Sequence, residues 1–324
     1  MSILSLADVF QARQRLAGRV VHTPLVESAP LSLRAGVPVF MKLELVQPTG
    51  SFKVRGATNA LADRVGEGVT RAVTASTGNH GRALAHAARA LGIEAAVCMS
   101  SLVPQNKVDA VALLGARVVI AGRSQDEAQI EALRMARDEG YAFVPPFDDP
   151  SVIAGQATIG LEIMEALPDA ATLVVPLSGG GLFSGTAFAA KAIRPDLRAI
   201  GVSMARGAAM HASLAAGTPV AVEEVATLAD SLGGGIGLDN RYTFAMTHDL
   251  ADDIVLVDEP SIARGIVHAY RSERLVIEGA AAVGIAALLD GRIPARNGPI
   301  VIVVSGANID IDAHRRIVME NADA

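Results

Sequence analysis

Cysteine and aromatic residues are scarce in this sequence. It contains one cysteine and no tryptophan, and aromatic residues make up 3% of its 324 positions. The single cysteine, Cys98, cannot form an internal disulfide, which is typical of proteins in a reducing cytoplasm. A formal net charge of −6 and the lack of aromatic rings argue against a nucleic-acid-binding surface, which needs a basic patch and stacking side chains. We therefore expect a cytoplasmic protein that binds no nucleic acid.

Long apolar runs are also missing. No run reaches the roughly 18–20 residues that a membrane-spanning helix needs, and the longest candidate, 280–289, is short and rich in alanine. Asp8, Arg13 and Arg15 lie at helical spacing near the N-terminus, which predicts a capped helix rather than a signal peptide. We expect no membrane partner.

The pattern of apolar segments predicts an α/β protein. Apolar residues make up 51% of the chain, and its length exceeds what one core usually supports, so we expect two domains. Strand-like and helix-like segments alternate, as they do around a mostly parallel sheet. The expected strands are 37–45, 70–74, 93–99, 116–121, 141–144, 171–177, 198–202 and 299–304. The expected helices are 51–65, 79–91, 103–114, 124–139, 152–167, 183–193, 261–274 and 280–289.

A lysine in the stretch 42–57 is the first candidate for chemistry. The chain has only four lysines, and Lys53 follows a Pro-Thr-Gly turn at the start of a helix that Ser51 can cap. Unpaired N–H groups in the first turn of a helix carry partial positive charge, which disfavours an ammonium ion. Such a lysine is shifted toward the neutral amine that condenses with a carbonyl. The alternative is an ordinary surface lysine.

Three further segments lie where strands end. The loop 178–182, Ser-Gly-Gly-Gly-Leu, joins a strand to a helix and fits a phosphate, although many such loops are only tight turns. The loop 76–81, Ser-Thr-Gly-Asn-His-Gly, is a second candidate anion site at a helix start. Ser305 ends an apolar strand, where ligands bind in open parallel sheets, although it could equally be a turn serine.

Together these segments resemble the fold-type-II pyridoxal-phosphate enzymes, specifically the threonine dehydratase and serine racemase family. The resemblance is carried by KLE…QPTGSFKVRGA, STGNHG, SGGGL and SGAN, and it covers about 23–310. It implies two three-layer α/β domains with mostly parallel twisted sheets, like the β subunit of tryptophan synthase. Residues 1–52 and 145–324 would form a large cofactor-binding domain, and 53–144 a small one. The segments around Phe147 and Glu278 also match and are expected to form pocket walls.

The resemblance also assigns roles to single residues. Lys53 would carry pyridoxal 5'-phosphate as an internal Schiff base, with Phe52 beside it. Asn79 would meet the ring hydroxyl, and Ser305 would face the ring nitrogen. His80 would either shape the loop or take part in catalysis. The cofactor phosphate is expected on Gly179, Gly180, Gly181 and Leu182. The substrate carboxylate is expected on Ser76, Thr77, Gly78, Asn79 and His80.

The implied activity is that of a pyridoxal-phosphate-dependent ammonia-lyase (dehydratase) that converts a β-hydroxy amino acid into a 2-oxo acid and ammonia. L-Threonine or L-serine is the default substrate; 3-hydroxyaspartate or a substrate of hydroxyectoine utilisation is an alternative. Racemisation is a second possible activity, since Thr77 lies where serine racemases have a serine that reprotonates the opposite face. The extra methyl group of Thr77 restricts its rotamers, so we expect elimination to dominate. A non-catalytic ligand-binding protein on the same scaffold is a further alternative, and we expect a homodimer.

We expect no metal site of the family type. Metal-binding members of this branch have a glutamate at the end of the strand after the phosphate loop and an aspartate six residues on. Here these positions hold Ser203 and Ala209. Hard cations such as Mg²⁺ need several oxygen ligands, preferably carboxylates, and this segment does not supply them.

Overall fold

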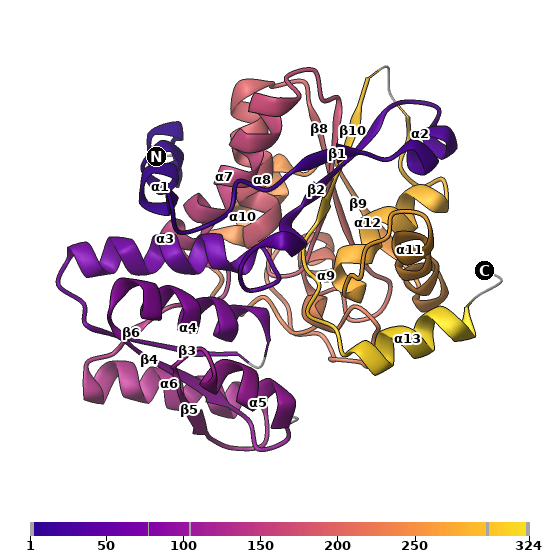
Figure 1. Ribbon diagram of the computed structural model, residues 1–324. Coiled ribbons are helices and arrows are strands. Elements are labelled where there is room, and N and C mark those ends of the chain that lie inside the picture. The colour runs from indigo at the N-terminus through magenta and orange to yellow at the C-terminus, as the bar shows by residue number, and fades with distance from the viewer. Residues whose placement is uncertain (1–2, 77, 104, 296–297, 322–324) are drawn as a thin grey trace.

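The structure is a computed structural model that describes residues 3–76, 78–103, 105–295 and 298–321. It contains two separate sheets (Figure 1). The larger has six strands in the order β1-β2-β10-β7-β8-β9, and all neighbours are parallel except β1 and β2. The smaller has four parallel strands in the order β5-β4-β3-β6. The prediction of an α/β fold with mostly parallel sheets is confirmed.

The strands are β1 (Leu25–Glu27), β2 (Val39–Leu43), β3 (Arg71–Ala75), β4 (Glu94–Met99), β5 (Arg117–Ile120), β6 (Ala142–Phe143), β7 (Thr172–Pro176), β8 (Arg198–Met204), β9 (Asp253–Val257) and β10 (Ile300–Val304). The helices are α1 (Leu6–Leu16), α2 (Ala29–Ala35), α3 (Lys53–Gly66), α4 (Asn79–Leu91), α5 (Gln105–Ala112), α6 (Gln125–Glu139), α7 (Pro150–Ala166), α8 (Gly181–Ile193), α9 (Ala209–Ala216), α10 (Thr243–Leu250), α11 (Glu259–Arg271), α12 (Gly279–Leu289) and α13 (Ile311–Glu320). Two short 3₁₀ helices, η1 (Glu44–Val46) and η2 (Asp230–Leu232), complete the described elements.

Each sheet lies between two layers of helices, and β10 illustrates why. Its sequence, Ile-Val-Ile-Val-Val, is apolar at every position and all five side chains are buried. Ile300, Ile302 and Val304 pack in one core with α11 and α12, whereas Val301 and Val303 pack in another with α7 and α8. Strands covered on both faces are apolar throughout for this reason.

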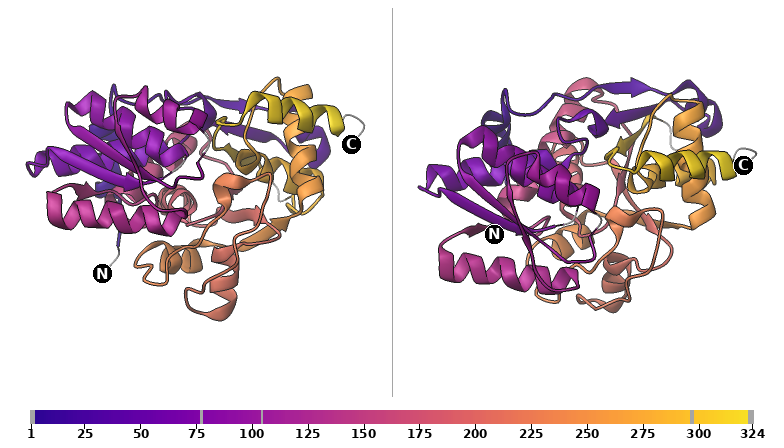
Figure 2. Two further views of the ribbon diagram at one scale, coloured as in Figure 1. Left: turned by 90° about the horizontal axis from the view of Figure 1, so that it is seen from below. Right: turned by 60° about the horizontal axis from the view of Figure 1, so that its bottom comes forward.

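The smaller sheet is built in the same way. Ala72 and Val97 pack toward α3 and α4, and Val73 and Ala96 pack toward α6. Figure 2 shows that this sheet and its helices form one side of the molecule, with the C-terminal helices on the other. Because the strands of the smaller sheet lie within 71–143, the predicted small domain of residues 53–144 has a candidate core of its own. The domain boundaries themselves stay predictions.

Two local expectations were wrong. Phe52, not Ser51, occupies the N-cap of α3, and no side chain caps this helix. Ser51 instead pairs with Gly306 in an isolated antiparallel bridge, so a contact with the far end of the chain overrides its capping preference. The strand expected to end at residue 202 continues to Met204, because Ser203 and Met204 pair with β9, a strand that we did not expect.

Other boundaries follow the sequence closely. The helix α4 begins at Asn79 and ends at Leu91, and Gly92 takes the left-handed conformation at its C-cap, with φ of 70°. The helix α1 begins with a capping box formed by Ser5 and Asp8. Within the described ranges, no helix combines the length and apolarity that a membrane crossing requires.

Candidate active site

The turn before Lys53 is fastened to the end of β10. The Phe52 N–H donates to the Ser305 carbonyl at 3.0 Å, and the Ala307 N–H donates to the Gly50 carbonyl at 2.9 Å. The strands β2 and β10 are parallel neighbours, so the segments that follow them leave at the same edge of the sheet. The structure therefore brings Lys53 and Ser305 together, as the sequence predicted.

The Lys53 side chain is half-buried, and its amine is held by a backbone carbonyl. Its Nζ donates to the Pro146 carbonyl at 2.7 Å and lies 5.2 Å from the centroid of the Phe52 ring. Burial lowers the Lys53 pKa to about 8, although the charge of Glu278 acts in the opposite direction. Roughly a tenth of the amine is therefore neutral at pH 7, far more than for an ordinary lysine, and the neutral amine is the form that attacks a carbonyl or takes a proton.

The glycine loop after β7 is moulded around Phe147. A side chain at Gly179 would collide with the Phe147 ring, and a Cβ at Gly181 would lie 3.0 Å from the Cα, Cβ and carbonyl oxygen of Phe147. Gly180 is the N-cap of α8 with φ of 89°, a conformation that favours glycine, and no side chain caps the helix. The first amides of α8, including that of buried Leu182, thus form a helix start suited to an anion. Phe147 directly follows Pro146, so one segment supports both this loop and Lys53.

The second loop lies between β3 and α4. Gly78 is the N-cap of α4, its N–H donates to Ser76 Oγ at 3.3 Å, and no side chain caps the helix start. Asn79 is buried, and its Nδ2 lies 2.9 Å and 3.1 Å from the two carboxylate oxygens of Glu278. Thr77, predicted to be catalytic, lies outside the described residues.

The sequence left two roles open for His80, shaping the loop or catalysis, and its contacts in the structure favour the first. Its Nε2 lies 3.0 Å from the Val144 carbonyl, which accepts a hydrogen bond, so Nε2 carries the proton. Burial, followed by the charge of Lys53, lowers the His80 pKa to about 3. The neutral ring thereby holds the segment 144–147, which contacts Lys53 and the glycine loop.

Comparison with known proteins identifies the family to which this architecture belongs. Residues 16–306 match the family described as pyridoxal-phosphate dependent enzyme. A protein of Sinorhizobium fredii with the provisional name threonine dehydratase is 55% identical over 98% of this chain and 96% of its own length. This chain belongs to the pyridoxal-phosphate-dependent enzyme family.

Two further relatives of this family member bear on its chemistry. An L-threonine ammonia-lyase of Geobacter sulfurreducens is 42% identical over 93% of this chain and 75% of its own length. The solved structure of maize serine racemase superposes with a TM-score of 0.90 at 30% identity, covering 98% of both chains. The predictions of the family, of pyridoxal phosphate as cofactor and of a pyridoxal-phosphate-dependent lyase are confirmed.

The residues present fit the functional groups of pyridoxal phosphate. A phosphate needs amide donors without competing side chains, and the start of α8 offers them where Phe147 leaves room only for glycines. A carbonyl needs a neutral amine, which Lys53 supplies. Ser305, buried directly after β10 of the larger sheet, and Asn79, buried at the start of α4 after β3 of the smaller sheet, supply a hydroxyl and an amide. Their assignment to individual atoms of the cofactor stays a prediction.

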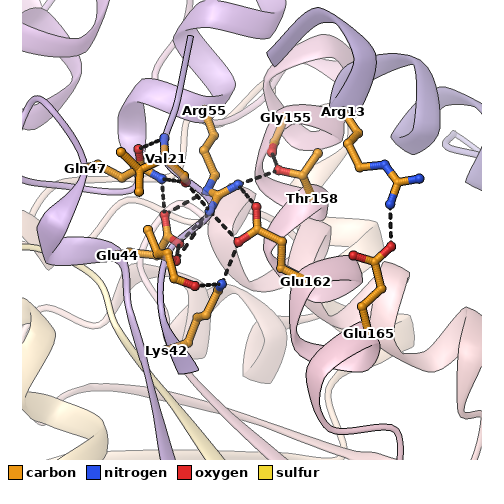
Figure 3. Close-up of polar contacts among 11 residues, drawn as sticks. Arg13, Val21, Lys42, Glu44, Gln47, Arg55, Gly155, Thr158, Glu162 and Glu165 are labelled. Carbon is orange, nitrogen blue, oxygen red and sulfur yellow. Dashed lines mark hydrogen bonds and ion pairs between the residues drawn. The ribbon is translucent and has the colours of Figure 1, made fainter. Parts of the chain in front are cut away.

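A buried ionic cluster fixes the helix that carries Lys53 (Figure 3). Arg55 donates to both oxygens of Glu44 at 2.8 and 2.9 Å and to both oxygens of Glu162 at 2.6 and 2.8 Å. Lys42 Nζ lies 2.5 Å from Glu162 Oε2. Two cations and two carboxylates thus balance in the interior and join α3 to β2, η1 and α7. Close approach of α3 to α7 also requires glycine, since a Cβ at Gly155 would lie 2.7 Å from the Arg55 carbonyl.

Glu278 and Phe147 contribute more than the pocket walls expected from the sequence. Phe147 shapes the glycine loop. Glu278 accepts a hydrogen bond from the amide of Asn79, and its charge acts to raise the pKa of Lys53. In the sequence, both residues were indicated by the local match to the family. Glu278 had a second, physical signal, because it is a glutamate directly before an otherwise apolar helix.

The segment around Ser203 carries no carboxylate ligand. Ser203 lies within β8 with its Oγ 3.4 Å from Met204 Sδ, and Ala209 is the first residue of α9. In the part of the chain that the structure describes, no three His, Cys, Asp or Glu side chains gather closely enough to hold a metal ion.

Proposed function

We propose that this enzyme is an ammonia-lyase that converts L-threonine or L-serine into a 2-oxo acid and ammonia. The observation that carries the proposal is the half-buried Lys53 amine, with its pKa lowered to about 8, which lies where the starts of α4 and α8 and the end of β10 converge. Such a site suits a reaction that joins a phosphate-bearing cofactor to a substrate carboxylate. The names of the relatives support the choice of substrate.

The proposal assigns each site residue a task. The amides of Gly179, Gly180, Gly181 and Leu182 hold the phosphate of the cofactor. Asn79 binds its ring hydroxyl, Ser305 faces its ring nitrogen, Phe52 flanks it and Lys53 binds its carbonyl carbon. When bound, pyridoxal phosphate supplies an electron sink for bonds at the substrate Cα.

Proton transfer then falls to Lys53. Once the substrate amine has displaced Lys53 from the carbonyl carbon, the freed neutral Nζ accepts the proton from the substrate Cα, and the lowered pKa makes this form available at neutral pH. The amides of residues 76–80 hold the substrate carboxylate and so orient the Cα–H bond toward Lys53. Ser305 offers a neutral hydroxyl where a carboxylate would stabilise a protonated ring nitrogen. We therefore expect rapid loss of the β-hydroxyl rather than transamination.

Racemisation is the second candidate, supported by the likeness to maize serine racemase. It requires an acid on the face opposite Lys53, and Thr77 carries a hydroxyl that could serve. Because of its restricted rotamers, we expect racemisation to be minor. Chiral chromatography of the serine reaction tests this: D-serine formed faster than pyruvate would reverse the order of the two activities.

Quaternary structure, compartment and domain division complete the proposal. We infer a cytoplasmic homodimer whose residues 53–144 form the small domain and whose residues 1–52 and 145–324 form the large one. The separation of the strands into two sheets supports the division. Light scattering of the purified enzyme tests the dimer, and limited proteolysis near residues 47–53 and 144–150 tests the boundaries.

The decisive experiment combines trapping with a substrate screen. The protein is loaded with pyridoxal phosphate, reduced with borohydride and digested, and the modified peptide is identified by mass spectrometry. We expect the label on Lys53 and none on Lys42, the matched buried lysine that is already bonded to Glu162. L-Threonine, L-serine and 3-hydroxyaspartate are then assayed for 2-oxo acid release. A colourless protein without label on Lys53 would contradict both the lyase and the racemase activity. Release of 2-oxo acid from 3-hydroxyaspartate alone would contradict L-threonine or L-serine as the substrate.

A further inference from the structure

Glu278 lies at the junction of the site and carries a carboxylate that is only 2% exposed. It is the N-cap of α12, and its N–H donates to the Gly306 carbonyl at 3.2 Å. A Cβ at Gly306 would lie 2.7 Å from Glu278 Oε1 and 3.1 Å from Ser51 Cβ. The glycine after Ser305 is therefore required because the carboxylate occupies the space beside it.

A directed chain of hydrogen bonds ends on this carboxylate. Arg82 Nη1 donates to Asn308 Oδ1 at 3.0 Å, and Asn308 Nδ2 donates to Asn79 Oδ1 at 2.6 Å. Asn79 Nδ2 in turn donates to Glu278. Each amide has its oxygen toward the cationic end and its nitrogen toward the anionic end. Rotating the Asn79 amide by 180° would place its oxygen against the carboxylate, so Glu278 fixes which way Asn79 points.

The carboxylate has no direct ionic partner within the described ranges. The charged groups that act on it from neighbouring elements are Lys53 on α3, Lys107 on α5 and Asp230 on η2. Arg82 on α4 reaches it only through the two asparagines. Burial raises the Glu278 pKa to about 7; the bond from Asn79 opposes this and Asp230 adds to it. The carboxylate is thus poised between its two protonation states beside the amine of Lys53.

We propose that Glu278 is a positioning residue that orients the Asn79 amide for the cofactor, and that its carboxylate, which lies beside the bridge between Gly306 and Ser51 just before Lys53, tunes the Lys53 amine through its charge. The first half rests on the proposed function, since it takes Asn79 as a cofactor ligand. The second half does not, because it concerns two side chains of this protein alone. The residue accepts no substrate proton in this scheme; it acts through Asn79 and Lys53.

The test measures Lys53 directly in cofactor-stripped, full-length protein. Competitive acetylation with peptide mass spectrometry gives the pH dependence of Lys53 labelling. Removing the charge in Glu278→Gln should lower the midpoint by about 0.5–1 pH unit, which raises labelling at pH 7 roughly 2- to 6-fold. The matched control is Glu273→Gln, whose carboxylate contacts Ser28 and His268 instead. An unchanged midpoint in folded Glu278→Gln would overturn the charge coupling.

The orientation of Asn79 has a separate readout in the holoenzyme. We expect Glu278→Gln to alter the cofactor absorption spectrum and its pH profile, and to lower kcat about 10- to 100-fold with a smaller change in KM. Glu278→Asp keeps the charge but shortens the reach to Asn79. It should restore the labelling midpoint while the spectrum stays altered. If Glu278→Gln does not fold, Glu278→Asp tests the orienting role by itself, because it shortens the reach to Asn79. A wild-type spectrum in that variant would contradict the orienting role.

The outcomes separate this inference from the proposed function. An active lyase in which substitution of Glu278 changes neither the midpoint of Lys53 labelling nor the cofactor absorption spectrum would refute only the role of Glu278. A protein that shows the shift in Lys53 labelling but releases no 2-oxo acid from any substrate would refute only the proposed activity.

Discussion

Two buried charged centres lie next to each other along α3, and they differ in how their charges are balanced. Around Arg55, burial opposes ionisation, but the contacts with Glu44 and Glu162 outweigh it and raise the Arg55 pKa. Burial likewise opposes ionisation of Glu162, yet its bonds to Arg55 and Lys42 lower its pKa. Around Lys53, burial dominates: the amine has a pKa of about 8 and Glu278 one of about 7.

The difference comes from geometry rather than residue type. Both centres contain a basic and an acidic side chain with little access to water. The Arg55 cluster pairs its charges in direct contact, which stabilises the charged forms and ties three elements together (Figure 3). Lys53 bonds a carbonyl and Glu278 bonds an amide, so each is driven toward its neutral form. The first arrangement suits a structural anchor, the second a group that must exchange protons.

The largest expected effect is the loss of activity on substituting Lys53, which distinguishes its centre from that of Arg55. Lys53→Ala should lower kcat/KM about 10³-fold or more, because it removes the proposed base. The unfolding free energy of the apoenzyme should stay unchanged or rise, since burying this amine is unfavourable. Steady-state kinetics and urea unfolding measure the two quantities. If Lys53→Ala kept activity within tenfold of wild type, the two centres could no longer be distinguished as catalytic and structural.

The reciprocal change concerns stability. Arg55→Met should destabilise the apoenzyme by about 3–5 kcal/mol, because Glu44 and Glu162 would remain buried with only Lys42 to compensate them. Denaturant unfolding of apoenzyme measures this, with Lys53→Met two positions earlier as the matched control. Equal losses in the two variants would mean that the clustering of charges does not matter.

The pH dependence of stability gives a smaller effect with a defined sign. The Glu278 pKa rises from 4.5 to about 7 on folding, so between these values the folded protein binds a proton that the unfolded chain does not. Stability should therefore fall by up to about 3 kcal/mol as pH rises from 4.5 to 7. Glu162, with its lowered pKa, contributes stability that is lost only as pH falls below its unfolded value.

Urea unfolding of apoenzyme between pH 5 and 7 checks this slope. Glu278→Gln should remove that part of the slope, whereas Glu273→Gln should keep it. Parallel pH profiles for wild type and Glu278→Gln would show that the carboxylate titrates normally.

The smallest expected effect is that of metal removal. Ser203 and Ala209 provide one hydroxyl and no carboxylate, so chelator treatment should change neither activity nor melting temperature. Assays with and without added Mg²⁺ measure both. A large loss restored by Mg²⁺ would show that carboxylates elsewhere reach this segment.

The sequence predicted the site where its signals are local. Lys53, the glycine loop and the start of α4 each depend on a turn followed by a helix, and such patterns can be read within a few residues. Ser51 shows the limit, since its hydroxyl has no partner among the described residues and its backbone pairs with Gly306 instead. Glu278 shows it again, because its neighbours Asn79, Lys53 and Asn308 come from segments far apart in the chain.

The fold itself followed from alternation and apolarity, but the strand order did not. Apolar strands such as β7 and β10 are evident from their composition, whereas no local property indicates that they lie side by side. The end of β8 was missed for the same reason, because its last residues are strand only through pairing with β9. Pairing between distant segments depends on the whole sheet.

The place of β10 between β2 and β7 has a consequence for synthesis of the protein. On the ribosome, the smaller sheet can form once residues 71–143 have emerged, because its strands are close in sequence. The larger sheet stays divided until Ile300–Val304 appears, and only then do the bonds from Ser305 and Gly306 close the turn before Lys53. A nascent chain therefore cannot close the turn before its reactive amine until β10 and Ser305 have emerged. Until then, the unfilled edges of β2 and β7 are the exposed strands that a chaperone would need to protect.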